Sequence, residues 1–372
     1  MSKSTGVALS AMDDTGKPID WWFIYKVAGK STASDKSKPT GLEFLYYDSS
    51  GKKKLAMSPN QIGDPLKGAV SATLNQIYNN LTDPGLGWFF YNDEDPLTGK
   101  TNGSRGHTKG VLCFDMDTNS GFWLVDSAPK FPLKGKYSYP ETATQNAQTF
   151  LCITLQNADT AKAIAAQMFV AQQPNVYLAS SVPAAIAGKS DPREALIKNT
   201  ITTDTTAYAN FIPFKSKGGE AFRCFAKNKH WDAANDDDFY NDLVGPALAE
   251  NLNVETWEHG PEPGTTDSDK VHTVVAMKSV DLAPLGCNPS YQWSEENDHA
   301  KLAITARSET GLKYVCVGDI NFTKTMEKRS GGTVAFICDG LWQEISSILT
   351  AVVPRTSNPV KNSKKTGKIV MK

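Results

Sequence analysis

The chain of 372 residues has few of the side chains that most often build metal sites. It contains 5 His and 6 Cys, and no two Cys stand in a Cys-x-x-Cys pair. Structural zinc sites usually draw on closely spaced thiols, so the sequence argues against one. The spacing of the six Cys allows disulfides but implies none. We therefore expect neither a metal ion nor another cofactor.

Long apolar segments are also missing. No run of 18 apolar residues occurs, so we expect no transmembrane helix and no membrane partner. The apolar stretch near residue 10 is too short for the core of a signal peptide. The compartment stays open between the cytoplasm and an acidic or external location reached after removal of a signal.

A strong net charge is absent as well. The formal net charge is −1 and the pI is about 6.5. A protein that binds nucleic acid through bulk charge would be more basic, so any polyanion site must be a local patch. At this length two domains or two fused halves are expected. We predict an N-terminal half over 1–185, a C-terminal half over 186–354 and a flexible basic tail over 355–372.

Two copies of a His-x-Lys motif are the most informative feature that is present. His107 and Lys109 form the first copy, and His299 and Lys301 form the second. Each copy runs directly into apolar, β-prone residues, which predicts that His and Lys lie on one face of a strand. The alternative is a pair of unrelated surface strands with solvated His and Lys side chains.

The surroundings of the two motifs also repeat. Ser127 stands twenty residues after His107 and closes an apolar run, and Asp319 does the same after His299. Each half reads as a helix, a strand, a His-x-Lys strand and a further strand. The expected ranges are 64–81, 85–91, 107–112 and 121–125 in the first half, and 239–252, 253–257, 299–304 and 313–318 in the second. This order predicts a duplicated unit and a mixed α/β sandwich with a pseudo-two-fold axis.

Such an axis can bring two His and two Lys into one cleft, which is a suitable set for phosphodiester hydrolysis without a metal. One neutral imidazole would attack phosphorus, and the other, protonated, would donate to the leaving oxygen. The two ammonium groups would neutralise the non-bridging oxygens. Because one imidazole must be charged and the other neutral, mildly acidic to neutral pH is favoured.

Further segments resemble the deoxyribonuclease II family, in its bacterial form, from about Leu9 to Trp342. The matching segments are Asp14-Thr15-Gly16-Lys17-Pro18-Ile19-Asp20-Trp21-Trp22, Gly106-His107-Thr108-Lys109-Gly110-Val111, Gly121-Phe122-Trp123-Leu124-Val125-Asp126-Ser127-Ala128-Pro129, Tyr137-Ser138-Tyr139-Pro140, Phe225-Ala226-Lys227 and Gly318-Asp319-Ile320-Asn321. The resemblance implies the phospholipase D-like fold, a mixed β-sheet sandwiched by helices and built from two fused pseudo-symmetric halves. It also implies an acid, metal-independent endonuclease that cuts double-stranded DNA and leaves 3′-phosphate ends.

The resemblance also implies residue roles. His107 and His299 would be the catalytic pair, with Lys109 and Lys301 as phosphate clamps. Residues expected near the substrate are Ser127, Asp319 and Asn321. The sequence does not reveal which His attacks, although analogy with the wider superfamily favours His107.

Two departures from the family pattern stand out. Animal members usually have a Cys at the position of Ala11, paired with the Cys that corresponds to Cys152, so this bridge is unavailable here. Asp126 occupies a position where many members have His, and its role is open. Two other functions also stay open: a phosphodiesterase of the same fold that acts on lipid head groups, and an inactive DNA-binding relative. The oligomeric state, including a homodimer, is undetermined.

Overall fold

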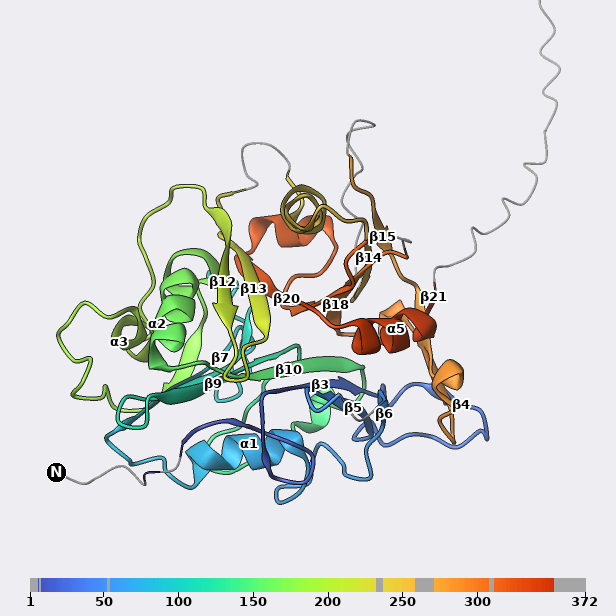
Figure 1. Cartoon of the computed structure of the whole chain (residues 1–372), viewed down its shortest axis with the longest axis horizontal. Helices are drawn as coiled ribbons and strands as arrows, with labels where there is room; N and C mark the ends of the chain where they lie inside the picture. The colour runs from blue at the N-terminus through green and yellow to red at the C-terminus, as the bar shows by residue number, and fades with distance from the viewer. Residues whose placement is uncertain are drawn as a thin grey trace, which may run out of the picture.

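A computed structural model describes residues 6, 8–51, 54–231, 237–257, 271–307 and 311–350. The predicted tail over 355–372 lies outside the described residues. Two large β-sheets pack face to face, the first in the lower half of Figure 1 and the second in the upper half. This is the mixed α/β class that the sequence predicts, with sheets that are almost wholly antiparallel.

The first sheet has eight strands. In spatial order they are β11 (Val176–Ala179), β7 (Leu86–Asn92), β8 (Lys109–Asp115), β9 (Ser120–Asp126), β10 (Gln148–Thr154), β3 (Trp21–Lys26), β5 (Phe44–Asp48) and β6 (Ala56–Met57). The second sheet has seven, in the order β12 (Ala209–Lys215), β13 (Ala221–Lys227), β20 (Gly331–Ile337), β19 (Tyr314–Gly318), β18 (Lys301–Thr305), β14 (Leu252–Thr256) and β15 (Val274–Ala276). Only β14 and β15 pair in parallel among these described strands.

The two sheets share one arrangement. The antiparallel row β7-β8-β9-β10-β3-β5 of the first corresponds to β14-β18-β19-β20-β13-β12 of the second. Strands β8 and β18, which follow the two motifs, therefore hold equivalent places one strand in from β7 and β14. This is the pseudo-symmetry that the repeated order of elements predicts.

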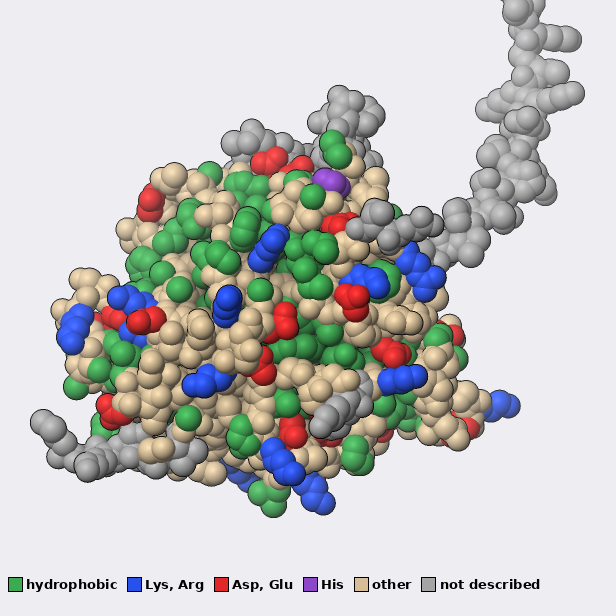
Figure 2. Space-filling view, viewed as in Figure 1, with side chains coloured by type: hydrophobic (Ala, Val, Ile, Leu, Met, Phe, Trp, Pro, Cys, Tyr) green, Lys and Arg blue, Asp and Glu red, His purple; other side chains and the backbone are tan. Residues whose placement is uncertain are grey.

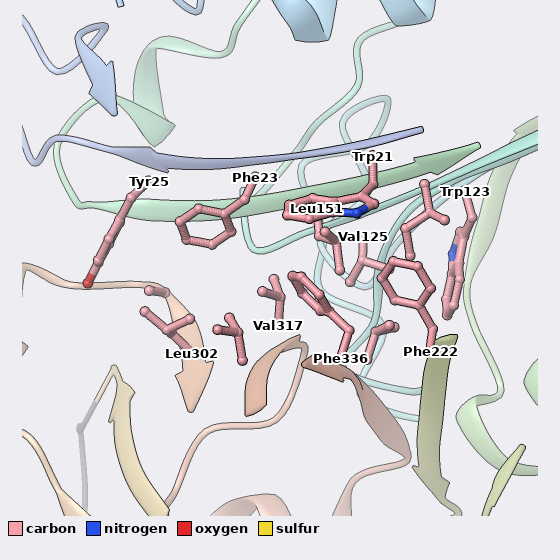
Figure 3. Packing of buried hydrophobic residues seen from close by; sticks show 14 of the residues in the cluster. Trp21, Phe23, Tyr25, Trp123, Val125, Leu151, Phe222, Leu302, Val317 and Phe336 are labelled. Atoms are coloured by element: carbon pink, nitrogen blue, oxygen red, sulfur yellow. The ribbon is translucent and has the colours of Figure 1, made fainter. Parts of the chain in front are cut away.

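The main hydrophobic core lies between the sheets. In β3, Trp21, Phe23 and Tyr25 point toward the second sheet, while Trp22 and Ile24 point to the opposite side and are also buried. Burial on both faces explains why this strand is apolar without alternation. Figure 3 shows side chains of the first sheet packed against Phe222, Leu302, Val317 and Phe336 of the second.

Helices cover the outer faces and flanks of the sheets. Helix α1 (Ala69–Tyr78) packs on the outer face of the first sheet (Figure 1). The π-helix η3 (Phe239–Val244) and α4 (Gly245–Leu248) cover the outer face of the second. At the flanks lie α2 (Ala158–Gln167), the π-helix η2 (Met168–Gln172), α3 (Pro192–Ile197) and α5 (Asp339–Ile348). Short 3₁₀ helices are η1 (Glu141–Ala143), η4 (Ala283–Leu285), η5 (Glu295–Asn297) and η6 (Lys324–Lys328).

Small sheets complete the fold. One contains β21 (Leu349–Thr350), β16 (Ser279–Asp281), β17 (Tyr291–Ser294) and β4 (Thr32–Ala33), and the other contains β1 (Ala11–Met12) and β2 (Pro18–Ile19). The first of these joins a strand from the start of the chain to three strands of the second half. The boundary at 185/186 stays a prediction.

Both predicted helices differ from the structure. The helix expected over 64–81 is shorter and forms α1, and the one expected over 239–252 ends at Leu248, because Leu252 already begins β14. None of the described helices is long and apolar enough to cross a membrane. On the face in Figure 2, basic and acidic side chains are interspersed, in keeping with the low net charge.

Candidate active site

Both motifs sit at the start of equivalent strands. Lys109 is the first residue of β8 and Lys301 the first of β18, so each His lies just before its strand. The prediction that His and Lys share a strand is therefore wrong for the two His. Their backbone N–H groups bond instead to the residues that precede β20 and β10, His107 to the Ser330 carbonyl at 2.8 Å and His299 to the Ala147 carbonyl at 2.9 Å.

All four motif side chains are buried. The exposed fraction is 8% for His107, 5% for His299, 1% for Lys109 and 0% for Lys301. Two solvated surface strands would leave these side chains in water, so that alternative is wrong. Burying two ammonium groups is costly unless each finds partners, which indicates a specific role for this cluster.

Each imidazole is held by a carbonyl of the opposite half. The distance from His107 Nδ1 to the Asp319 carbonyl oxygen is 2.6 Å, and that from His299 Nδ1 to the Ser127 carbonyl oxygen is 2.9 Å. Ser127 and Asp319 are the residues that stand twenty positions after each His. Because a carbonyl only accepts, Nδ1 carries the hydrogen in both rings. The lone pair of each ring therefore lies on Nε2, which has no hydrogen-bond partner among the described residues.

The two lysines have different partners. Lys109 Nζ lies 2.5 Å from an oxygen of Asp93, whose other oxygen accepts a hydrogen bond from Arg329 at 2.9 Å. Lys301 Nζ donates to the carbonyl oxygen of His299 at 2.7 Å. The same ammonium lies 3.2 Å from His299 Nδ1. The two halves thus place equivalent lysines in unequal surroundings.

The electrostatics of the cluster favour neutral imidazoles in the free protein. Burial, with the charge of Lys109, lowers the pKa of His107 to about 3. Burial and the charges of Lys301, Lys109 and His107 hold the pKa of His299 well below its ordinary value. Burial and the charge of Lys109 likewise hold the pKa of Lys301 well below its usual range. Since each half lowers pKa values in the other, the two motifs share one electrostatic site.

A buried network fixes the residue before His299. One Asp298 oxygen accepts hydrogen bonds from Tyr25 Oη and, at 2.7 Å, from Trp293 Nε1; the other accepts the Ala300 N–H at 2.8 Å. The Trp257 ring packs on the His299 ring with centroids 4.8 Å apart. The second motif is therefore held at its backbone and by an aromatic contact with its imidazole.

The predicted substrate residues lie at different places around the motifs. Ser127 Oγ donates to Gln148 Oε1 at 2.6 Å, which lies 3.3 Å from His299 Nδ1, and an Asp319 oxygen accepts the Lys109 N–H at 3.3 Å. Asn321 Oδ1 is buried and has no hydrogen-bond partner among the described residues. Ser127 and Asp319 thus join the His-Lys cluster, and no hydrogen bond in the described part of the chain links the Asn321 side chain to it.

Comparison with known proteins identifies the family. The deoxyribonuclease II family model matches residues 10–354. The chain belongs to the deoxyribonuclease II family. It is therefore an enzyme of the nuclease class, a hydrolase that acts on phosphodiester bonds, with the phospholipase D-like fold. The resemblance of the sequence segments to this family is confirmed.

Individual relatives cover most of the chain. A Burkholderia pseudomallei (strain K96243) protein named "Putative deoxyribonuclease-2" is 39% identical over 352 residues, which are 94% of each chain. "Plancitoxin-1" of Acanthaster planci is 33% identical and spans 89% of this chain and 88% of its own. "Deoxyribonuclease-2-alpha" of Rattus norvegicus is 30% identical over 93% of this chain and 95% of its own.

The structure describes the surroundings of Cys152 and Asp126, the residues involved in the two departures of this chain from the deoxyribonuclease II family pattern. All six Cys are free, and Cys152 is fully buried in β10. Asp126 is fully buried in β9, and burial raises its pKa to about 8. One of its oxygens accepts the Ala128 N–H at 2.9 Å, so its visible role is to shape the turn after β9. Among the described residues, no cluster of three or more His, Cys, Asp or Glu is arranged to hold a metal ion.

Sequence reasoning missed several residues of the deoxyribonuclease II site. Asp93, Arg329, Trp257 and Gln148 all contact the motif residues or their partners. Asp93 offered one signal, because it is the first polar side chain beyond the buried strand β7 that precedes the His107 loop. Arg329 lies 236 positions from Asp93 and offered none.

Proposed function

We propose that this deoxyribonuclease is an acid, metal-independent endonuclease that cuts double-stranded DNA and leaves 3′-phosphate ends. His107 and His299 are its catalytic pair, and Lys109 and Lys301 bind the phosphate. The observation that supports the proposal is the exchange of carbonyl partners between the halves, which places the lone pair of each imidazole on Nε2 in a cluster with two buried lysines.

The chemistry follows from these groups. One neutral imidazole attacks phosphorus through Nε2 and forms a phosphohistidine, while the other imidazole, protonated, gives its proton to the leaving 5′-oxygen. The second imidazole, now neutral, then takes a proton from water, which displaces the first and releases the 3′-phosphate. The ammonium groups stabilise the charge on the non-bridging oxygens throughout.

The lowered pKa values support activity in acid. Burial and neighbouring cations disfavour protonation of both imidazoles, and the pKa of His107 is lowered to about 3. The reactive state needs one protonated imidazole, so its population rises as the pH falls below the ordinary value for His. A bound phosphodiester adds a negative charge to the cluster and assists that protonation.

Recognition of the substrate belongs to the same proposal. Double-stranded DNA is the expected partner, and Ser127, Asp319 and Asn321 are expected near the scissile phosphate. With a net charge of −1, affinity must come from cations close to the site rather than from the whole surface. A homodimer is compatible with this scheme, and the scheme does not require one.

Plasmid nicking at pH 5 in EDTA tests the proposal. His107→Ala and His299→Ala should each lower the rate by at least about a hundredfold, because each removes a separate proton or phosphoryl transfer. His272→Ala, at a half-exposed position, is the matched control and should cleave at the wild-type rate. The fragments should carry 5′-hydroxyl ends that polynucleotide kinase labels without prior dephosphorylation.

Three results would contradict the proposal. They are unchanged nicking in either variant, a requirement for divalent metal, and choline release from phosphatidylcholine liposomes without loss of plasmid. Circular dichroism of each variant ensures that a loss of rate reflects chemistry rather than unfolding.

A further inference from the structure

The two half-sites differ at one equivalent position. In the first half Asn92 pairs with Lys109 across β7 and β8, and in the second Thr256 pairs with Lys301 across β14 and β18. The next residue along the chain is Asp93 in the first half and Trp257 in the second. We infer that Asp93 makes the half-sites unequal, so that His107 carries the proton and His299 attacks phosphorus. This inference rests on the proposed function.

Asp93 places a buried negative charge near His107, where the cations Lys109, Lys301 and Arg329 also act on the ring. The Asp93 side chain is 1% exposed and bonds to Lys109 at 2.5 Å and to Arg329 at 2.9 Å. An anion buried beside an imidazole stabilises the imidazolium. Consistent with this, the charge of Asp93 raises the pKa of His107 against the larger lowering by burial and Lys109.

On the His299 side the buried carboxylate is Asp298, and it accepts hydrogen bonds from Tyr25 and Trp293 rather than from Lys301. Among the described residues, no carboxylate forms an ion pair with Lys301, whose ammonium lies 3.2 Å from His299 Nδ1. Because His299 Nδ1 already donates to the Ser127 carbonyl, this approach is a contact between two donors and opposes a positive charge on the ring. The Trp257 ring packs against the imidazole, with centroids 4.8 Å apart and the ring planes tilted by 54°. A neutral His299 with its Nε2 lone pair free is the expected state.

Each imidazole then has a defined role in the reaction. His299 Nε2 forms a bond to phosphorus, the bond from phosphorus to the 5′-oxygen breaks, and that oxygen takes the Nε2 proton of His107. Water next attacks phosphorus and gives a proton to His107 Nε2. The phosphorus–nitrogen bond breaks, and its electron pair returns to His299. One diester and one water give one 3′-phosphate and one 5′-hydroxyl.

A duplex with one 5′-bridging phosphorothiolate linkage separates the two roles, because a thiolate leaves without protonation. His107→Asn should release the thiol once per enzyme and accumulate DNA bound covalently to His299, since it lacks the base for the second step. His299→Asn should release none. A colorimetric assay measures the released thiol, and mass spectrometry identifies the residue that carries the DNA.

The outcomes distinguish the inference from the function beneath it. Thiol release by His299→Asn, with DNA attached to His107, would overturn the inference and leave the phosphohistidine mechanism intact. Absence of a covalent adduct in both variants, while the wild type cleaves the linkage, would overturn the mechanism itself.

Asp93 is a positioning residue in this scheme, and Asp93→Asn tests it separately. Cleavage of ordinary duplex should fall by at least about tenfold, because the acid is harder to protonate. Cleavage of the phosphorothiolate linkage should stay within about twofold of wild type, because that step needs no acid. Asp95→Asn, a charge change in the same loop, should leave both rates unchanged. Equal losses on the two substrates would show a structural role and overturn the inference.

Discussion

Each reactive imidazole is oriented by a main-chain carbonyl rather than by an acidic side chain. A carbonyl does not titrate, so the Nδ1 hydrogen bonds of His107 and His299 hold one tautomer across the acid range. A carboxylate in the same place would also favour the imidazolium of both rings. The carbonyl therefore orients each ring, and the surrounding charges determine which of the two imidazoles is protonated.

The same burial makes the folded protein sensitive to acid. The pKa of His107 is about 3 in the folded state and about 6.5 in an unfolded chain. Below pH 6.5 the His107 imidazole binds a proton in the unfolded chain but not in the folded state. The free energy of unfolding therefore falls as the pH falls, by up to about 1.4 kcal/mol per pH unit. Above pH 6.5 this contribution is constant. His107→Gln should therefore flatten the decline between pH 6.5 and 4.5 in urea unfolding.

A control variant separates the effect of His107 from that of the other groups that titrate in this pH range. His272→Gln removes a half-exposed His outside the site and should leave the decline as in the wild type. A wild-type slope in His107→Gln would show that the buried imidazole is not the group that resists protonation.

At the scale of single elements, the segment that leads into β8 packs closely against η2. A Cβ built on Gly106 would come 1.8 Å from the Gln172 carbonyl oxygen, and the Gly106 N–H donates to the Gln173 carbonyl at 2.8 Å. Gly106→Ala should push this segment away from η2 and displace His107. We expect nicking to fall by at least about a hundredfold, since displacements of about 1 Å cost that much.

Gly103→Ala is the matched control for that prediction. It lies in the same loop, and a Cβ there would meet nothing within 4 Å. The two variants are compared by plasmid nicking and by thermal unfolding. Wild-type nicking by Gly106→Ala would mean that the loop absorbs the clash without moving the imidazole.

The elements also show how far sequence reasoning reaches. Strands such as β3 and β9 were predictable because every residue in them is buried, which leaves continuous apolar runs. The reciprocal spacing of Ser127 and Asp319 was visible too. What the spacing could not show is that each carbonyl serves the imidazole of the other half. That fact, like the approach of Arg329 to Asp93, depends on how two sheets pack rather than on any local pattern.

At the scale of the whole molecule, the site exists only while the sheets stay together. Each His lies just before a strand of one sheet and bonds to the carbonyl of the residue that follows a strand of the other. Phe336 of the second sheet lies at the centre of their interface, with its ring 4.9 Å from Trp21 and 5.1 Å from Phe222 (Figure 3). A substitution here tests whether packing between the sheets supports catalysis at a distance.

Phe336→Ala should lower the free energy of unfolding by about 3–5 kcal/mol, because it leaves a cavity in a close-packed core. Ile337→Ala, next in the same strand and 41% exposed, should lower it by less than about 1 kcal/mol. Urea unfolding gives both values, and both variants should unfold in a single transition. Nicking at pH 5 should fall in Phe336→Ala and not in Ile337→Ala, because loosened sheets no longer hold each imidazole on the opposite carbonyl. Two separate unfolding transitions would mean that the halves are independent, and the shared site would then lose its structural basis.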